Sequence, residues 1–428
     1  MNYQPHALLT GILKADMKPA LGVTEPGAIA FAVSRARSLV NGEIVQVTLR
    51  LNSGMYKNAF TCGIPNSDKF GNAFAAALGA VGANPDAGLE SLSAITAEHN
   101  RLAQALLDAG KIKVELSGIT PDIFIQATVE TESGSCTVTI EHGHTDITSI
   151  TLNGETVLSA PPQREKGEET GIHAFGLEQL LEFVNTVEED SLTLMMEAYT
   201  VNLALLQASL DSPRTVFTKV LYQENGQRLI SVNELATAQL MCNGAIEARV
   251  IGLDKPAMSI TGSGAHGIIC TMPLYAFCKV RGLSQEKLLR ATALSYLVTM
   301  YIKEYSGRLS AFCGCAIAAG TGMACALAWL HGAGYEQICG VISNMASSIT
   351  GMICDGGNQG CTMKGIVAVD AAFRSVDLAM SGASVDVIHG INGRTPEDTM
   401  RHMGLIASPG MTATEGTILE IMQKKNAG

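Results

Sequence analysis

The sequence predicts an α+β protein, with a mixed sheet and helices in its N-terminal part and a large helical domain around a buried central helix after it. Two patterns predict this class. Short segments between residues 43 and 152 alternate apolar and polar residues, as strands with one buried face do. Longer apolar segments separated by glycine-rich loops dominate from residue 177 onward and indicate helices. Hydrophobic residues make up 47% of the 428 residues and charged residues only 16%, so the chain can bury a large core.

The N-terminal third is predicted to place helices beside a sheet. Residues 1–40 should form a helix, a turn bracketed by Pro19 and Pro26, and a second helix over 27–40. Proline favours such a boundary because its ring fixes φ and removes the amide donor. Two further helices are expected at 71–82 and 89–109, with strands at 43–53, 112–116, 123–130, 136–141 and 146–152.

A charged, proline-containing segment at 161–171 is predicted to link two units. We therefore expect three regions: residues 1–40, packed on the helical domain; an α+β sheet domain over 41–165; and a helical domain over 166–428. Helices of the last region are predicted at 177–188, 192–210, 212–223, 232–250, 273–280, 284–304, 309–330, 335–353, 362–378, 384–391 and 412–424.

The segment 311–330 has no formal charge and is long enough to cross a bilayer. It also contains Gly314, Gly320 and Gly322, and its flanks lack the aromatic belts of a membrane helix. We expect a buried central helix of a soluble protein; a membrane span is the alternative.

Charge and cysteine content restrict the partners and the compartment. The net charge is −11 and no lysine or arginine cluster is present, which argues against nucleic acid and anionic membranes as partners. The 11 cysteines are an odd number, and the N-terminus lacks a signal-peptide pattern, so we expect free thiols in the cytoplasm. A small-molecule substrate is the expected partner, and a homo-oligomer is possible.

The strongest local signal is the segment 351–364. Cys354 and Cys361 flank a loop with three glycines, between the end of one predicted helix and the start of another. Glycines let the backbone approach a bulky group, and a helix N-terminus favours a thiolate. Cys313 and Cys315 precede this loop, and their helical spacing predicts that only one of them faces a shared site. Two buried thiols beside a tight turn are the alternative to metal ligation.

Three further motifs contain polar groups. The glycine-rich segment 261–267 could hold an anion with its backbone amides, or it could be a simple helix entry; it matches neither a P-loop nor a dinucleotide fingerprint. Thr24 and Glu25 stand between prolines, either as a fixed polar contact or as a helix cap. Lys57 and Asn58 follow a strand, and His142 and His144 share one face of a strand, a pattern that is more often structural than metal-binding.

Taken together and in order, these motifs resemble the L-cysteine desulfidase family, which is related to the α-domain of iron–sulfur L-serine dehydratases. The resemblance runs essentially end to end. It is carried by residues 18–26, 55–58, 75–80, 143–147, 262–264, 308–311, 313, 348–356 and 361–364.

The resemblance implies an oxygen-labile [4Fe–4S] cluster on Cys313, Cys354 and Cys361. It implies that the open iron binds the thiol or hydroxyl of a small α-amino acid, and that β-elimination then yields pyruvate and ammonia, with sulfide released from cysteine. Such a reaction needs a base at Cα and a group that holds the carboxylate. The candidate bases, in order, are His266, His144 and Lys57, with Glu25 as a further catalytic candidate. The candidates for substrate binding are Thr24, Asn58, Gly262, Ser263 and Gly264; Lys57 is a further candidate for holding the carboxylate.

The chain departs from the family pattern at two places. Many members have cysteine where this chain has Val23, and Asn-Gln where it has Ala265 and His266. Both positions are expected to face the substrate. The departures indicate serine or another amino acid as substrate, or a family member that binds a small molecule without turnover.

Overall fold

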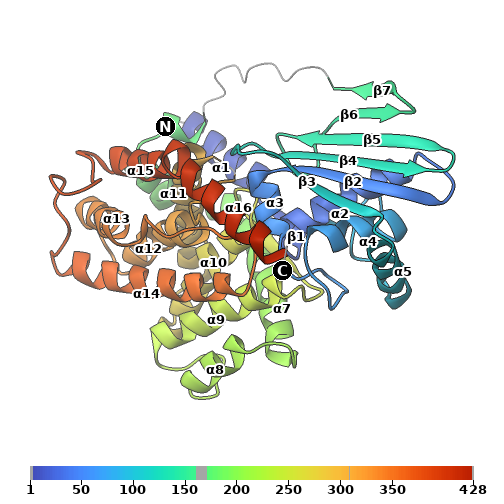
Figure 1. Ribbon diagram of the computed structural model, residues 1–428. Helices are drawn as coiled ribbons and strands as arrows, with labels where there is room; N and C mark the ends of the chain where they lie inside the picture. The colour runs from blue at the N-terminus through green and yellow to red at the C-terminus, as the bar shows by residue number, and fades with distance from the viewer. Residues whose placement is uncertain (1–2, 161–170, 308, 427–428) are drawn as a thin grey trace.

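The computed structural model describes residues 3–160, 171–307 and 309–426, and it confirms the α+β class. A mixed sheet lies beside a helical domain (Figure 1). Among the described residues the larger sheet has six strands in the order β3-β2-β4-β5-β6-β7. Their bounds are β2 (Ile44–Asn52), β3 (Ile112–Gly118), β4 (Phe124–Thr131), β5 (Gly134–Glu141), β6 (Ile147–Leu152) and β7 (Glu155–Ser159).

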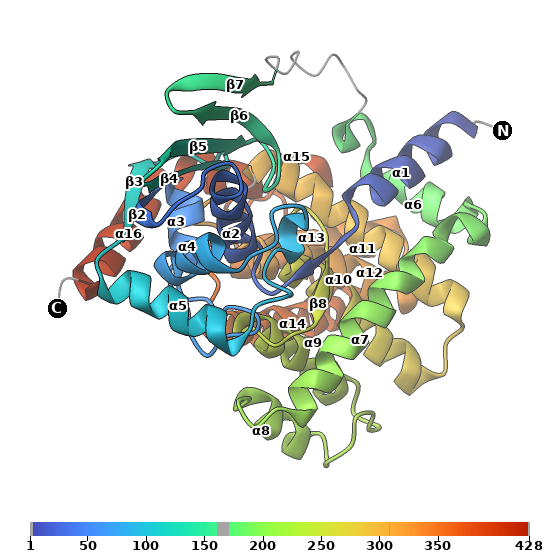
Figure 2. The ribbon, with the colours of Figure 1, turned by 90° about the vertical axis from the view of Figure 1, so that its right-hand side faces the viewer.

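Only β2 and β3 pair in parallel, and the other neighbours are antiparallel. The alternation along β4 buries Ile125, Ala127 and Val129 completely, while the residues between them are partly exposed. The buried face packs against α2 (Thr24–Arg37) and α4 (Asn72–Val81), which cover one side of the sheet (Figure 2). This half-buried arrangement is typical of antiparallel sheets.

The N-terminal segment joins the two parts of the molecule. Helix α1 (Tyr3–Asp16) contacts α6 and α11 of the helical domain, whereas α2 packs on the sheet. Between them, β1 (Lys18–Leu21) pairs antiparallel with β8 (Pro256–Ser259). The predicted boundary between 165 and 166, and almost all of the predicted linker, lie outside the described residues.

The helical domain surrounds α12 (Gly320–Leu330), which is buried over Gly320–Ala328 and contacts α10, α11, α13 and α14. The other helices are α6 (Leu177–Thr186), α7 (Met196–Asp211), α8 (Phe217–Glu224), α9 (Glu234–Val250), α10 (Gly264–Arg281), α11 (Gln285–Ser306), α13 (Tyr335–Ile349), α14 (Gly360–Met380), α15 (Pro396–Leu405) and α16 (Thr412–Asn426). No helix in the described part of the chain combines the length and apolar character needed to cross a bilayer.

Several predicted helices differ from the structure. The helix expected at 273–280 is α10, which begins nine residues earlier, at Gly264, and continues through Pro273. The helix expected at 89–109 is α5 (Ala97–Asp108), because Thr96 caps it and accepts a hydrogen bond from the amide of His99. The helix expected at 384–391 is absent, since the Asn344 side chain bonds the backbone of Ala383 and Val385. The predicted central helix is shorter: a π-helical turn over Cys315–Ala319 precedes α12, and an irregular segment precedes that turn. Sequence periodicity also missed α3 (Ser53–Ala59), α15 and the short strands β1, β7 and β8.

Candidate functional site

Two of the predicted ligand cysteines lie on chain segments that pair directly. Phe312 and Ile353 form an isolated antiparallel bridge. The Cys313 amide donates to the Met352 carbonyl at 3.0 Å, and the Cys354 amide donates to the Ala311 carbonyl at 2.6 Å. Because side chains alternate across paired strands, Cys313 and Cys354 project from the same side of this bridge as diagonal neighbours.

The third cysteine returns to the same place through the glycine-rich loop. Gly356 has φ +101, and a Cβ there would come within 2.4 Å of the Lys57 carbonyl oxygen, so the loop needs glycine. Cys361 lies in the first turn of α14, and its thiol donates to the Gly356 carbonyl at 3.3 Å. Burial is the main cause that raises the pKa of Cys361, and the thiols of Cys354 and Cys313 raise it as well.

Cys315 differs from its predicted core position. It is only half-buried, and a hydrogen bond between the two thiols is the first cause that raises the pKa of Cys313 above its ordinary value. Helical spacing does not separate the two residues, because Cys313 lies in the extended bridge and only Cys315 begins the π-helical turn. The site therefore has four thiols rather than three.

The donor set fits an iron–sulfur cluster. Within the described residues, no three His, Cys, Asp or Glu side chains are close enough to hold a single metal ion. In a cubane each thiolate binds a different iron, so the sulfurs stand farther apart than the ligands of one ion. Burial raises the pKa of Cys354, while the ammonium groups of Lys57 and Lys364 lower it. These cations would offset the negative charge of metal-bound thiolates.

Asn58 connects the cysteine loop to the Thr24-Glu25 motif. Its amide nitrogen donates to Glu25 Oε1 at 2.8 Å, and the Cys354 thiol lies 3.9 Å from its amide oxygen. Glu25 is only 6% exposed, so this bond holds a buried carboxyl group in place. Thr24 is the first residue of α2, not its cap, and its hydroxyl is free to bond outside the helix.

The Thr24 hydroxyl donates to the Gly262 carbonyl at 3.4 Å, which brings in the glycine-rich loop. His144 lies against the same glycine: a Cβ on Gly262 would be 3.7 Å from its ring. Three motifs that are far apart in sequence thus meet at Gly262. Ser263 precedes α10 and makes no side-chain bond to the helix.

His266 connects the glycine-rich loop to the segment that contains Cys313. The Thr261 hydroxyl oxygen lies 2.7 Å from the Ile260 carbonyl oxygen and 2.6 Å from His266 Nδ1. If the hydroxyl donates to the carbonyl, Nδ1–H donates to the hydroxyl and Nε2 is the unprotonated nitrogen. It lies against Gly314, where an added Cβ would come within 2.7 Å of it, and Gly314 separates Cys313 from Cys315.

The candidate residues therefore form a closed ring of contacts. The ring runs through Glu25, Asn58, Cys354, Cys313, Gly314, His266, Thr261, Gly262 and Thr24. His144 touches the ring at Gly262, and Cys361 lies beside it, bonded to Gly356 two residues after Cys354. All predicted site residues lie on or beside this ring, although they come from both structural units.

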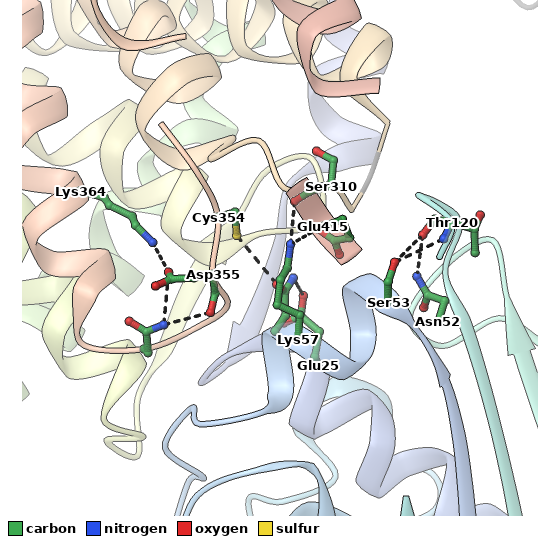
Figure 3. Close-up of polar contacts among 12 residues, drawn as sticks. Glu25, Asn52, Ser53, Lys57, Thr120, Ser310, Cys354, Asp355, Lys364 and Glu415 are labelled. Carbon is green, nitrogen blue, oxygen red and sulfur yellow. Dashed lines mark hydrogen bonds and ion pairs between the residues drawn. The ribbon is translucent and has the colours of Figure 1, made fainter. Parts of the chain in front are cut away.

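Lys57 is the exception in its orientation. Its ammonium forms an ion pair with Glu415 of α16 at 2.6 Å and donates to the Ser310 carbonyl at 2.9 Å (Figure 3). Both side chains are buried, with 0% and 5% exposure. The Lys57 ammonium thus already binds a carboxylate of the protein. The predicted role of Lys57 in binding the substrate carboxylate is therefore not expected.

Sequence patterns did not identify three charged residues near the site: Glu415, Lys303 and Arg249. Lys364, in contrast, stands in the predicted cysteine segment. Lys364 pairs with Asp355 beside Cys354 (Figure 3), and Glu415 pairs with Lys57. Lys303 is buried, which lowers its pKa to about 8, while the thiols of Cys315, Cys354 and Cys313 raise it. Arg249 lies behind Gly264. Each of the three comes from a helix whose pattern indicated only core packing.

The two departures from the family pattern also lie at the site. Val23 is 2% exposed, and a Cβ on Gly357 would come within 2.8 Å of its side chain, so an apolar group borders the cysteine loop. Ala265 is 1% exposed in the first turn of α10, next to His266.

His266 makes stability depend on pH. Burial, together with the charges of Lys303 and Arg249, lowers its pKa from the ordinary 6.5 to about 3. Below pH 6.5 the unfolded chain therefore binds a proton at His266, whereas the folded chain does not bind it until the pH approaches 3. The unfolding free energy falls as the pH is lowered through this range. From pH 7 to pH 5 the unfolding free energy should fall by about 2 kcal/mol more in the wild type than in His266→Gln.

Urea unfolding of metal-free protein at the two pH values would check this expectation. The exposed His389→Gln serves as the control and should behave as wild type. Equal pH dependence in wild type and His266→Gln would contradict the burial of a neutral imidazole.

Comparison with known proteins indicates a lyase-type enzyme of the serine dehydratase class. The sequence profile described as "Serine dehydratase alpha chain" matches residues 86–420, and the chain belongs to this family. It is 37% identical over 423 residues to a UPF0597 protein of Clostridium botulinum (strain Okra / Type B1), covering 97% of this chain and 98% of the relative. UPF0597 proteins of Desulfatibacillum aliphaticivorans and Caldanaerobacter subterraneus subsp. tengcongensis are each 34% identical, over 97% and 98% of both chains, respectively.

Proposed function

We propose that this protein is an iron–sulfur-dependent lyase that carries out β-elimination on a small α-amino acid, L-serine or L-cysteine. The observation that carries the proposal is the closed ring of contacts. It brings three mutually close thiols, one neutral imidazole and a glycine-rich helix entry to one place.

Cys313, Cys354 and Cys361 are the residues that would hold a [4Fe–4S] cluster. Three thiolates leave one iron open, and that iron would supply a Lewis acid for the hydroxyl or thiol that leaves the substrate. Lys364 and Lys303 are nearby cations: Lys364 interacts electrostatically with all three thiols, and Lys303 with Cys354, Cys313 and Cys315. Their charge would favour thiolate ligands over protonated thiols.

His266 is the residue we assign to the α-proton. Its Nε2 carries a lone pair and lies beside Gly314, between the two cysteines of that segment. Thr261 fixes the ring by accepting the Nδ1–H bond, as the orienting partner of a general base does. Thiolate ligands would carry negative charge close to His266, and negative charge raises the pKa of a histidine. The imidazole would therefore be more basic in the cluster-bound protein than in the metal-free protein.

The remaining ring residues would position the substrate. Glu25 and Asn58 form a rigid polar pair on one side, and Thr24 and His144 border Gly262 on the other. The overall reactions balance: L-serine gives pyruvate and ammonia, and L-cysteine with one water gives pyruvate, ammonia and hydrogen sulfide. The proton that His266 removes from Cα is available to the leaving group.

The test is to purify the protein without oxygen, measure iron and acid-labile sulfide per chain, and assay pyruvate formation from L-serine, L-cysteine and D-serine. We expect about four iron and four sulfide per chain and turnover of at least one L-amino acid but not of D-serine. A chain that takes up no iron after anaerobic reconstitution would defeat the proposal.

A second outcome would assign a different role. Val23 replaces a thiol beside the cysteine loop, and this departure favours a protein that binds a small molecule without converting it. Iron in the expected amount with no pyruvate from either L-amino acid would support that alternative.

A further inference from the structure

Arg249, near the end of α9, is a buried cation that has no counter-ion among the described residues. It is 4% exposed, and its Nε has no hydrogen-bond partner within the described residues. None of the ion pairs in the described part of the chain includes it. A guanidinium loses its hydration when it is buried, so an unpaired one is costly unless an anion binds to it.

The guanidinium lies at the N-terminus of α10. A Cβ on Gly264 would come within 2.8 Å of Arg249 Nε and 3.2 Å of its Cδ, so a larger residue there would collide with Arg249. Gly264 is the first residue of α10, and the first amides of a helix have no carbonyl partner within the helix. A helix N-terminus carries partial positive charge. Two positive features therefore stand side by side, and both favour an anion.

The other charged groups nearby are already engaged or lie at the far end of the loop. The carboxylate of Asp16 accepts the amide of Thr261, three residues before Gly264. Glu25 accepts from Asn58, and Lys57 is paired with Glu415. Within the described residues, Arg249 is thus the cation at the Gly264 end of the loop, away from Asp16, while Lys303 is the cation on the Gly314 side of His266.

Arg249 also lies near His266, the proposed base. Its charge is among the causes that lower the pKa of His266, so the guanidinium and the imidazole are close. His266 lies two residues after Gly264 on the same helix. A carboxylate bound at the start of α10 would therefore leave the neighbouring carbon atom near the imidazole.

We propose that Arg249 and the amides that open α10 bind the carboxylate of the small amino-acid substrate. Arginine suits this role because its fork of N–H donors matches the two oxygens of a carboxylate. The identity of the ligand rests on the proposed function, whereas the anion site rests on the contacts of Arg249 and Gly264.

The test is calorimetric binding to the metal-free, full-length protein, with L-serine and L-serinamide as probes. Wild type should bind L-serine but not L-serinamide, which lacks the carboxylate. Arg249→Met should weaken L-serine binding by about 100-fold. Arg214→Met is the matched control, because the Arg214 guanidinium already donates to the Ile251 carbonyl; it should bind as wild type does.

Stability supplies a second reading. Removal of an unpaired buried charge should leave the unfolding midpoint of Arg249→Met unchanged or raised. A fall of several degrees would show that the guanidinium has a structural partner and would count against the proposal. If Arg249→Met does not fold, Arg249→Lys should retain binding that is about 10-fold weaker.

Unchanged affinity of Arg249→Met for L-serine, or no binding of L-serine by wild type, would overturn the inference. Tighter binding of inorganic phosphate than of L-serine would overturn it as well, since the site would then serve another anion. These binding experiments use metal-free protein. A failed pyruvate assay would therefore contradict the proposed function without affecting the binding result.

Discussion

Lys57→Ala is expected to lower the unfolding free energy by about 3–5 kcal/mol, because it leaves the buried carboxylate of Glu415 without a counter-ion. The pair is 0% and 5% exposed; Lys57 bonds Glu415 Oε2, and Oε1 has no hydrogen-bond partner in the described part of the chain. Glu415 lines a cavity of about 30 Å³ together with Ser310, and this volume can hold a water molecule but not a counter-ion side chain. Urea unfolding at pH 7 would measure the loss.

The double variant Lys57→Met, Glu415→Leu separates structure from chemistry. An apolar pair of similar volume should fold within about 1 kcal/mol of wild type, because neither charge is left alone. If this variant folds but no longer forms pyruvate, the pair takes part in the reaction. If it keeps activity, Lys57 is structural only. A Lys57→Ala variant as stable as wild type would contradict the buried pair.

Cys354→Ala is expected to lower the iron content from about four atoms per chain to less than one, and pyruvate formation by at least about 1000-fold. A cubane that loses one of three protein ligands is poorly held, and the open iron loses its fixed position. Iron analysis and the visible spectrum of anaerobic protein would measure the first effect independently of activity.

Cys315→Ala is the matched control for this variant. Cys315 lies two residues from a predicted ligand and its thiol bonds that of Cys313, yet it begins the π-helical turn rather than the paired segment. We expect Cys315→Ala to keep its iron while Cys313→Ala loses it. The opposite result would move the third ligand from Cys313 to Cys315.

The fold class could be predicted from sequence because the main strands and helices depend on local residue patterns. The alternation in β4 and the helical pattern of α9 and α11 depend on residues a few positions apart, and these elements were found within a few residues. Elements that depend on distant partners were missed. The strand β1 exists because Lys18–Leu21 meets Pro256–Ser259, and no local pattern of four residues indicates that pairing.

The candidate site divides in the same way. Glycine and cysteine spacing identified the loops at 261–267 and 354–361, because special backbone conformations require special residues. The counter-ions were not found: Glu415 and Arg249 each stand in an ordinary helix and matter only through a neighbour far away in sequence. The error over Cys315 arose because a regular helix was assumed where the chain is extended and then π-helical.

Lys57 and Glu415 are 358 positions apart in the sequence, so Lys57 is synthesised long before its partner. An ammonium group stays hydrated until its carboxylate partner is present. Helix α3 therefore gains the counter-ion of its buried lysine only after α16, near the other end of the sequence, has been synthesised.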